Sequence, residues 1–497
     1  MYQRREFLKL VGGSILGTVL PKVAAGAKGK KQYNVLLICV DDLRPQLGCF
    51  GHKEMISPNI DRLADEGRLF TRHYVQSAVC GPSRCTMLTG RMKWSWDCWG
   101  EARKLKTEPK EAVSFAHLFH RNGYRTVCIG KVSHQPGGVL DKEQKIYQVP
   151  FSWDLAFAPV GEWGTPWRAF FSYDKGKAYN KPYNKFIHME KDEPQLPYES
   201  ADVSDEGYAD GLNAKAAIKQ LGDLKKRDEP FFLAVGFYKP HLPFNAPKNY
   251  WDLYDREKIG TAKNDYPPKN IDPAISMHKS YEVTTHYLWP SGAGNISEEE
   301  AKTLRHGYYA CVSYVDTQIG KVLDEVKRLD LEDHTIVVLW SDHGWHLGEH
   351  GMFGKQTNFD IATRSVLIIK VPGMPSPGKR AQGLVETLDV YPTLAELCGL
   401  TVPKNLQGQS LVAMVRDPLS PGKECARSYH PRGQIQGRTL KTKIFRIVRW
   451  TDKKGRIVQV ELYDHRKDPD ENFNIAAEQP EIVKKLLARM PTAFKGL

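Results

Sequence analysis

Short apolar runs that end in polar side chains recur through the first 400 positions of the chain. The clearest examples cover residues 35–40, 126–129, 231–235 and 335–340. Continuous runs rich in Val, Ile, Leu and Phe predict strands that are buried on both faces, as in a parallel sheet. We therefore expect a large sheet that is covered on both sides.

Helical patterns separate these runs. Ser57 and Pro58 open a segment in which Ile60, Leu63 and Ala64 share one face. A longer segment repeats apolar residues at helical spacing, namely Leu304, Tyr308, Cys311, Val315, Ile319, Val322 and Val326. Alternation of strands and helices predicts an α/β sandwich with a large, mixed, mostly parallel sheet flanked by helices.

The pattern changes after about residue 402. Residues 444–450 and 457–463 flank a turn at 452–455, which predicts an antiparallel hairpin. We expect a main domain over residues 33–402 and a smaller α+β subdomain with an antiparallel sheet over residues 403–497. Within the main domain, residues 255–295 are rich in Lys, Asp, Pro and Tyr, and this irregular insertion could shape a ligand pocket.

Polar clusters follow each of the four predicted strands. In open parallel sheets, ligands bind beyond the carboxyl ends of the strands, so these clusters should meet in one site. Asp41, Asp42 and Asp342 are among them. Their carboxylates would repel one another without a cation, and calcium accepts flexible, oxygen-rich shells. The sequence therefore predicts a calcium site here, although an isolated Asp pair is more often a solvated turn.

Composition and charge agree with a folded protein that acts on an acidic substrate. The chain has 497 residues, of which 41% are hydrophobic and 10% aromatic. Its formal net charge is +13; the first 31 residues carry seven Lys or Arg and one Glu, which leaves +7 for the rest. Such an excess suits acidic substrates such as sulfated sugars, although most of these lysines and arginines are expected to be ordinary solvated surface residues. Without a basic–aromatic module, nucleic acid is not an expected partner.

The first 27 residues resemble a twin-arginine signal peptide of bacteria. Arg4 and Arg5 precede a modest apolar run over residues 10–20, and small residues follow at 25–27. The run is too short and glycine-rich for a stable membrane anchor. We expect export by the twin-arginine machinery to the periplasm or the cell exterior. Few of the nine cysteines should form disulfides, because such chains fold in the reducing cytosol.

Residues 80–91, CGPSRCTMLTGR, form the most informative motif. Pro82 suits the first turn of a helix and Gly90 its far end. Cys80 would then lie at a helix N-terminus, where free N–H groups and the helix dipole favour an anion. A Cys80–Cys85 disulfide or half of a metal site is the alternative, but no second cysteine pair with zinc-like spacing follows.

This motif, C-x-P-S-R followed by L-T-G-R, is the signature of the type I, formylglycine-dependent sulfatases. Residues 34–45, 130–134, 231–244 and 341–351 resemble the iduronate-2-sulfatase branch of that family. Two features are typical of the branch: the K-x-x-H spacing of Lys131 and His134, and His343 where most sulfatases carry Asn. The resemblance covers roughly residues 33–402 and, more weakly, the tail.

The resemblance implies an alkaline-phosphatase-like fold and a sulfuric ester hydrolase that acts on a sulfated carbohydrate. A maturation enzyme would convert Cys80 to Cα-formylglycine (3-oxoalanine), whose hydrated form, a gem-diol, is the nucleophile. One Ca²⁺ per chain would be held by Asp41, Asp42, Asp342, His343 and modified Cys80. Imidazole is a soft ligand for calcium, so His343 could instead orient a water or the sulfate.

The remaining roles follow from the same resemblance. Arg84, Lys131 and Lys355 would cradle the sulfate oxygens. His241, with Lys355, would protonate the leaving sugar oxygen, and His134 would deprotonate the second diol hydroxyl to expel sulfate. Trp345 would border the sugar pocket, with packing in the core as an equal alternative.

Three other functions compete with this interpretation. A phosphate or phosphonate monoester hydrolase shares the expected fold, but such enzymes typically use Ser or Thr and zinc. A non-catalytic binding protein is disfavoured, because no expected site residue is missing. Residues 346–350 match the zinc-peptidase pattern H-x-x-E-H, which requires a helix. Gly344, Gly348 and Gly351 predict a loop there instead.

Overall fold

The computed structural model describes residues 32–142, 146–178, 195–289 and 296–490. The predicted signal peptide, residues 1–27, lies outside these ranges. Among the helices that are described, none combines the length and apolar character needed to cross a membrane. All nine cysteines are free thiols.

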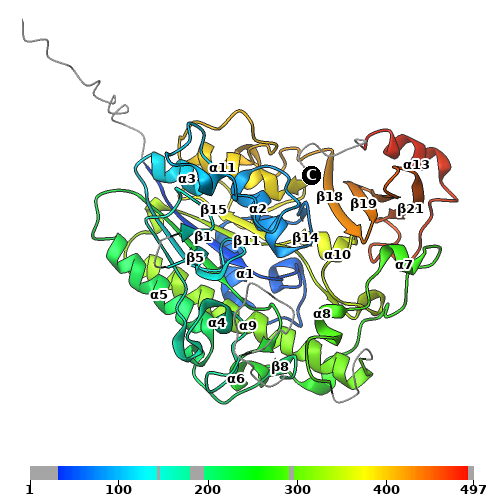
Figure 1. Ribbon diagram of the computed structural model, residues 1–497, viewed down its shortest axis with the longest axis horizontal. Coiled ribbons are helices and arrows are strands. Elements are labelled where there is room, and N and C mark those ends of the chain that lie inside the picture. Colours follow the sequence, from blue (N-terminus) through cyan, green and yellow to red (C-terminus); the bar gives the residue numbers. More distant parts are fainter. Residues whose placement is uncertain (1–31, 143–145, 179–194, 290–295, 491–497) are drawn as a thin grey trace, which may run out of the picture.

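A mixed sheet of eight strands forms the centre of the main domain (Figure 1). Its order is β16 (Arg380–Ala381), β2 (Arg68–Phe70), β15 (Leu367–Lys370), β11 (Thr335–Ser341), β1 (Asn34–Val40), β9 (Phe231–Phe237), β4 (Arg125–Gly130) and β7 (Leu155–Phe157). The run from β11 to β7 is parallel, whereas β15 is antiparallel to both β11 and β2. All four strands predicted from apolar runs are present and adjacent, so the predicted mostly parallel sheet is confirmed.

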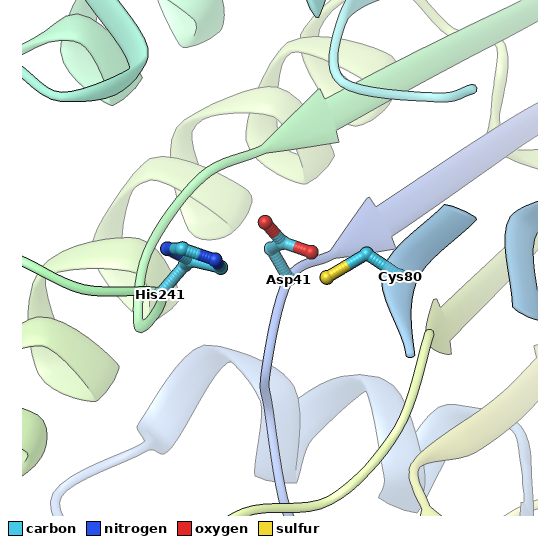
Figure 2. A group of neighbouring side chains, drawn as sticks. All are labelled: Asp41, Cys80 and His241. Atoms are coloured by element: carbon cyan, nitrogen blue, oxygen red, sulfur yellow. The ribbon is translucent and has the colours of Figure 1, made fainter. Parts of the chain in front are cut away.

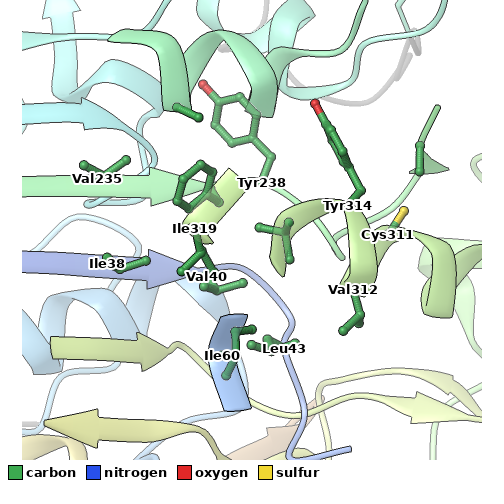
Figure 3. Close-up of a cluster of buried hydrophobic side chains, with 14 of the residues drawn as sticks. Ile38, Val40, Leu43, Ile60, Val235, Tyr238, Cys311, Val312, Tyr314 and Ile319 are labelled. Carbon is green, nitrogen blue, oxygen red and sulfur yellow. The ribbon is translucent and has the colours of Figure 1, made fainter. Parts of the chain in front are cut away.

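Helices cover both faces of this sheet (Figure 1). One face packs on α1 (Pro58–Glu66), α5 (Ala209–Leu224) and α9 (Glu298–Arg328); the other packs on α2 (Cys80–Thr89), α3 (Phe115–Arg121), α11 (Val390–Leu397) and α12 (Val412–Arg416). Alternate residues of β1 enter opposite cores, with Ile38 and Val40 on the α9 side (Figure 3) and Cys39 on the α2 side. Both helices predicted from periodicity, now α1 and α9, are confirmed.

Short elements complete the main domain around the strand ends. They are β3 (His73–Tyr74), β5 (Val139–Asp141), β6 (Ile146–Tyr147), β8 (Tyr198–Glu199), β10 (Phe244–Asn245), β12 (His346–Leu347), β13 (Phe353–Gly354), β14 (Arg364–Ser365), β17 (Val385–Glu386), α4 (Pro166–Phe170), α6 (Lys248–Trp251), α7 (Pro273–Ser276), α8 (Tyr281–Thr284) and α10 (Asp360–Thr363). The irregular insertion at 255–295 contains α7 and α8, and its residues 290–295 lie outside the described part.

A second, antiparallel sheet lies beside the main domain, in orange and red in Figure 1. It consists of β18 (Cys425–Arg432), β19 (Ile435–Thr442), β20 (Phe445–Thr451) and β21 (Ile457–Asp464), and α13 (Pro480–Leu487) packs against it. The predicted hairpin is the β20–β21 pair. The sequence predicts that the main domain ends at residue 402. Met414 and Val415 of α12, which follow that position, still pack in the core of the main domain.

The register of the parallel strands brings their carboxyl ends to one level. Val40 at the end of β1 pairs with Ser341 of β11 and Phe237 of β9, and Gly130 of β4 pairs with Gly236 of β9. A Cβ at Gly236 would lie 2.1 Å from the backbone of Lys131. Only glycine therefore lets the chain after β4 lie this close to β9.

We expect Gly236→Ala to destabilise the protein by about 2 kcal/mol, because the added methyl forces the Lys131 backbone away from β9. Chemical denaturation measures this. Gly222→Ala is the matched control: Gly222 lies in α5, and no described atom lies within 4 Å of the place that an added methyl would take. That change should stabilise the protein by about 0.5 kcal/mol, since alanine is the better helix former. Equal effects of the two changes would contradict the close approach.

Candidate active site

Cys80 is the first residue of α2, as the motif predicted. The helix ends at Gly90, whose φ of 64° and N–H bond to the Thr86 carbonyl form the left-handed cap that glycine favours. Ser83 donates to the carbonyl of Asp342 at 2.5 Å, which fixes the first turn of α2 to the end of β11. The sulfur of Cys80 is thereby held over the carboxyl edge of the main sheet.

Asp41, Asp42 and Asp342 meet at that edge. Each is fully buried, and one carboxylate oxygen of each lies within 4.8 Å of the others. The backbone N–H of Asp42 donates to Asp342 at 3.0 Å, and Asp42 adopts a φ of 61°, which is rare for a residue with a side chain. The fold thus holds three hard oxygen ligands in one space, where they could bind a divalent metal ion.

Three cationic side chains surround the carboxylates. Lys131 Nζ lies 2.6 Å from Asp41, and Lys355 Nζ lies 3.0 Å from both oxygens of Asp42. Arg84 donates from Nη2 to Asp41 at 2.9 Å and from Nε to Asp342 at 3.0 Å, and its Nη1 donates to the carbonyl of Lys131. Arg84 has no exposed surface. Its donors hold the aspartates, whereas the sequence analysis assigned them to sulfate oxygens.

The acidities of the three aspartates differ because their surroundings differ. Burial alone would raise the pKa of Asp41, but Lys131 and Arg84 outweigh it and hold that pKa well below its ordinary value. Burial, reinforced by the charges of Asp41 and Asp342, raises the pKa of Asp42 well above its usual range. Burial and the charge of Asp41 raise the pKa of Asp342 to about 7. Cations that bind here stabilise all three in the ionised form.

His343 directs one ring nitrogen into this cluster. Its Nδ1 lies 3.0 Å from the carbonyl of Gly344, which assigns the proton to that nitrogen and leaves Nε2 as an acceptor. Nε2 is 3.3 Å from the sulfur of Cys80 and 3.4 Å from Asp42. Burial holds the pKa of His343 well below its ordinary value. A neutral imidazole with an inward lone pair has the form of a metal ligand.

His241 approaches the cluster from the loop after β9. Figure 2 shows the carboxylate of Asp41 between the imidazole of His241 and the sulfur of Cys80. Nδ1 of His241 donates to the Leu242 carbonyl at 2.6 Å, and Nε2 lies 3.4 Å from Glu282. Glu282, on α8, is also 3.7 Å from Lys355 Nζ. His241 and Lys355 therefore face the same acidic side chain.

His134 and Trp345 lie in different surroundings. The ring of His134 packs 4.9 Å from Trp96 and 5.6 Å from Trp167, and burial, reinforced by Lys131, holds its pKa well below its ordinary value. Trp345 has no exposed surface and lies under the ammonium of Lys355, 4.9 Å from ring centroid to Nζ. This position favours the packing role for Trp345 over a wall of the sugar pocket.

Two residues of the site were not singled out from the sequence. The hydroxyl of Tyr308 accepts from the N–H of Arg44 at 3.0 Å and donates to the carbonyl of Asp42 at 2.8 Å. Helical periodicity identified Tyr308 only as a core position. Glu282 lies in the insertion at 255–295, and nothing local distinguishes it from other surface acids of that segment. Its role depends on contacts with residues far away in the chain.

The H-x-x-E-H pattern is confirmed as a loop. His346 lies in the two-residue strand β12, and His350, with a φ of 59°, follows in a short turn. Glu349 pairs with Arg44 at 3.0 Å, and His346 Nε2 lies 2.9 Å from the hydroxyl of Thr357. The zinc-peptidase geometry, with both histidines on one helix face, is not formed.

A buried carboxylate cluster beside the nucleophile position, at the carboxyl edge of a mostly parallel sheet, defines a hydrolase site of the alkaline-phosphatase-like class. The family model "Sulfatase" matches residues 33–400, and the chain belongs to this family. It is an enzyme, a sulfatase that removes sulfate from a sulfated substrate. A second model, "N-sulphoglucosamine sulphohydrolase, C-terminal", matches residues 348–495.

Curated relatives agree with this assignment. Iduronate 2-sulfatase of Mus musculus is 34% identical over 433 residues, which is 81% of this chain and 75% of the relative. A sulfatase of Formosa agariphila is 30% identical over 453 residues, 89% of this chain and 83% of the relative. The predicted membership of the sulfatase family, with its likeness to iduronate 2-sulfatases, is confirmed.

Solved structures share the fold. A protein in complex with its substrate D-glucosamine-2-N,6-O-disulfate has a TM-score of 0.68 and 21% identity, with 92% of this chain and 97% of that chain covered. The phosphonate monoester hydrolase of Agrobacterium radiobacter has a TM-score of 0.69 and 22% identity, with 92% and 95% covered. The architecture is therefore common to sulfate and phosphonate hydrolases.

We expect Tyr308→Phe to lower kcat/KM by about tenfold, because the carbonyl of Asp42 loses the hydroxyl that fixes it and the carboxylate shifts. The loss of stability should be about 1 kcal/mol. Steady-state kinetics and thermal unfolding measure the two effects. Tyr309→Phe is the control, since the Tyr309 hydroxyl accepts from Gln46 at 2.8 Å, outside the cluster. It should lose similar stability and keep its activity, and an equal activity loss in both variants would contradict the assignment.

Proposed function

We propose that this sulfatase hydrolyses a sulfate ester of a carbohydrate, with Cys80 converted to Cα-formylglycine and one Ca²⁺ held beside it. The observation that carries the proposal is the set of overlapping ligand groups around Cys80: Asp42 and His343 on one side, Asp41 and His241 on the other, with Asp342 beside both aspartates. All of these side chains are buried. Together they supply a nucleophile position, a metal site and a proton donor.

Charge balance supports a divalent ion. The carboxylates of Asp41, Asp42 and Asp342 are matched in number by the cations of Arg84, Lys131 and Lys355. A divalent ion adds two positive charges, which a monoanionic sulfate ester and one ionised hydroxyl then balance. The donor set is mostly carboxylate oxygen, which suits calcium better than zinc. His343, through Nε2, would be its one nitrogen ligand.

The side chains around the site have distinct tasks in this mechanism. Hydrated formylglycine supplies two hydroxyls on one carbon, one to attack sulfur and one whose later deprotonation expels sulfate. Lys131 donates to a carboxylate oxygen of Asp41, and Lys355 donates to those of Asp42. A metal ion at this site would bind the same carboxylates. The same ammonium groups would donate to the sulfate oxygens and stabilise the charge of the transition state. Arg84 is a positioning residue that keeps Asp41 and Asp342 in place.

Proton transfer falls to two histidines. Nε2 of His241 faces the cluster while Nδ1 is held by the Leu242 carbonyl, so this ring presents one nitrogen to the leaving sugar oxygen. Burial and the charge of Lys355 hold the pKa of His241 well below its ordinary value, and Asp41 and Glu282, the latter 3.4 Å away, oppose this shift. His134 is assigned to the deprotonation that releases sulfate. Burial and the charge of Lys131 hold its pKa well below its ordinary value, which keeps the ring in the neutral form that a general base requires.

The substrate class is supported by the relatives. Iduronate 2-sulfatases are similar over most of the chain, and a fold neighbour is described in complex with a disulfated glucosamine. We assign this chain to the breakdown of sulfated oligosaccharides or polysaccharides, with iduronate 2-sulfate as the nearest analogue. A phosphate monoester would bring a second negative charge at neutral pH, which exceeds the charge balance of the site. Relative rates on sulfate and phosphate esters of one sugar separate these two functions.

Two further partners belong to the proposal. A formylglycine-generating enzyme would oxidise Cys80, because the C-x-P-S-R run that such an enzyme reads is intact. The twin-arginine machinery would export the folded protein to the periplasm or the cell exterior, on the evidence of Arg4 and Arg5.

Mass spectrometry of the peptide that contains position 80 should detect an aldehyde when the protein is co-expressed with a maturation enzyme. Cys80→Ser should abolish turnover, since a serine offers no second hydroxyl to expel the sulfate. Cys85→Ser is the control, because Cys85 lies in the same helix but in the core of the α2 face. It should retain both the aldehyde and the activity. Full activity with an unmodified thiol at position 80 would refute the mechanism.

Removal of divalent metal with a chelator should abolish activity and lower the unfolding temperature, and calcium should restore both. Asp342→Asn should lose activity and most of the calcium-dependent stabilisation, because one of three charged ligands is gone. Asp316→Asn is the control: Asp316 is also buried but caps α1 by accepting from Ile60 N–H at 2.7 Å. It should lose stability and keep the calcium response. Restoration by zinc and not by calcium would favour the phosphatase alternative.

A further inference from the structure

A group of basic side chains lies next to the catalytic lysine on the side of the C-terminal sheet. Arg432, the last residue of β18, donates to the carbonyl of Gln356 at 2.9 Å. His278 Nε2 lies 2.8 Å from the carbonyl of Lys355. Both side chains therefore contact consecutive residues of the segment whose Lys355 ammonium faces Asp42. Consecutive residues are only about 3.8 Å apart, so this group adjoins the sulfate-ester site.

Arg432 and His430 have no acidic partner within the described part of the chain. Among the described residues, the phenol of Tyr281 is the titratable group that acts on Arg432, and the buried Nε of Arg432 has no hydrogen-bond partner. His430, two residues earlier on β18, is only 6% exposed, and its Nδ1 also has no partner. Burial lowers the pKa of Arg432 to about 10, and the neighbour that opposes this is the phenol of Tyr281. Arg432 is half-buried, and a partly desolvated cation without a counter-charge is better accommodated when an anion completes the site.

An aromatic segment connects this group to the nucleophile. Trp94 packs on His430 with ring centroids 5.5 Å apart. Two residues later, Trp96 is 52% exposed and rests on Gly81, the residue after Cys80, where a Cβ would meet its ring at 2.6 Å. Trp96 also lies against His134 at 4.9 Å. The apolar face of a sugar packs well on such a ring, so one carbohydrate could extend from Cys80 toward Arg432.

We propose that Arg432 and His430 form a second anion-binding subsite, which takes a second negatively charged group of the carbohydrate whose sulfate ester lies at Cys80. This rests on the proposed function and extends it to the substrate class. The ligand chemistry is a planar or tetrahedral oxyanion, supplied either by the carboxylate of a uronic acid or by another sulfate. Arginine suits both, because its fork of donors matches carboxylate and sulfate oxygens in pairs.

The subsite makes the C-terminal sheet a determinant of specificity. A substrate with one charge would fill only the ester site, whereas a polyanionic sugar would also neutralise Arg432. The acidic Glu282 lies beside the ammonium group of Lys355 and the ring of His241, and its charge also acts on His278, so it would repel a second anion there. We therefore expect selection for sulfated sugars that carry their second charge on the Arg432 side.

The test compares matched substrates in Arg432→Gln. The first pair is a sulfated uronic acid and the same sugar with its carboxyl group reduced to an alcohol; the second is a disulfated sugar and its monosulfated counterpart. For each pair, the preference is the ratio of kcat/KM for the doubly charged to the singly charged sugar. Arg432→Gln should lower that preference about tenfold or more, mainly through KM, because a charge-assisted contact is lost. Arg432→Lys should restore part of it.

Arg427→Gln is the matched control. Arg427 lies on the same strand, is exposed, and points to the other face of β18, so its loss removes the same charge without touching the subsite. It should keep the wild-type preference. If Arg432→Gln lowers the preference only for the uronic acid pair, the ligand of the subsite is a carboxylate. If it lowers the preference only for the disulfated pair, the ligand is a sulfate. Equal preferences in the wild type, Arg432→Gln and Arg427→Gln would overturn the proposal.

Calorimetric titration of the same sugars onto the Cys80→Ala variant tests the subsite without turnover. Binding should favour the doubly charged sugar of a pair, and adding Arg432→Gln should reduce that advantage about tenfold, as expected for a lost charge-assisted contact. If the wild type with verified formylglycine hydrolyses no carbohydrate sulfate, the proposed function fails, while the titration still decides the subsite. Absence of any binding advantage for the second charge would overturn the subsite by itself.

Discussion

Three aspartates that share one buried space are the constraint on which the rest of this structure depends. Asp41, Asp42 and Asp342 come from the ends of two adjacent strands, and their mutual repulsion in a poorly hydrated space would open the sheet edge if nothing compensated it. Arg84 spans two of them from the nucleophile helix, and two lysines arrive from other segments. The ion pairs of Arg84 therefore offset the repulsion between the carboxylates and also hold the helix that carries Cys80 beside them.

This electrostatic core explains why so much of the site was visible in the sequence. Continuous apolar runs identify buried strands, and the polar residues after them must meet where parallel strands end, so Asp41, Asp342, Lys131 and His241 could be grouped without coordinates. The helix at Cys80 followed from proline and glycine at its two ends. The local sequence pattern was sufficient because the carboxyl ends of neighbouring parallel strands lie at the same edge of a sheet. Residues that follow different strands in the sequence are therefore close in space.

Other features depend on contacts that no local pattern records. Arg84 was expected to bind sulfate, but only the structure reveals that its donors are taken by Asp41 and Asp342, the latter 258 positions away. Trp345 follows the aspartate motif, yet its ring lies under Lys355 because the loop turns back at glycines. Arg432 lies in a strand of the second sheet, and its place beside Gln356 depends on how the two sheets dock. The packing of α12 in the main core, after the predicted boundary at 402, likewise depends on contacts between distant segments.

The burial of Cys80 has a consequence for the maturation of this protein. Its side chain is only 3% exposed, with its sulfur 3.3 Å from His343, beneath a helix start that Ser83 and Arg84 fasten to the sheet. Under the proposed function, a second protein must reach this thiol, and the folded protein leaves it almost fully buried. Oxidation of Cys80 must therefore precede folding, and a chain that folds with an unmodified thiol would stay inactive. The fraction of active enzyme would then depend on the rate of Cys80 oxidation relative to the rate of folding. A variant that folds more slowly would give a preparation with a higher fraction of formylglycine.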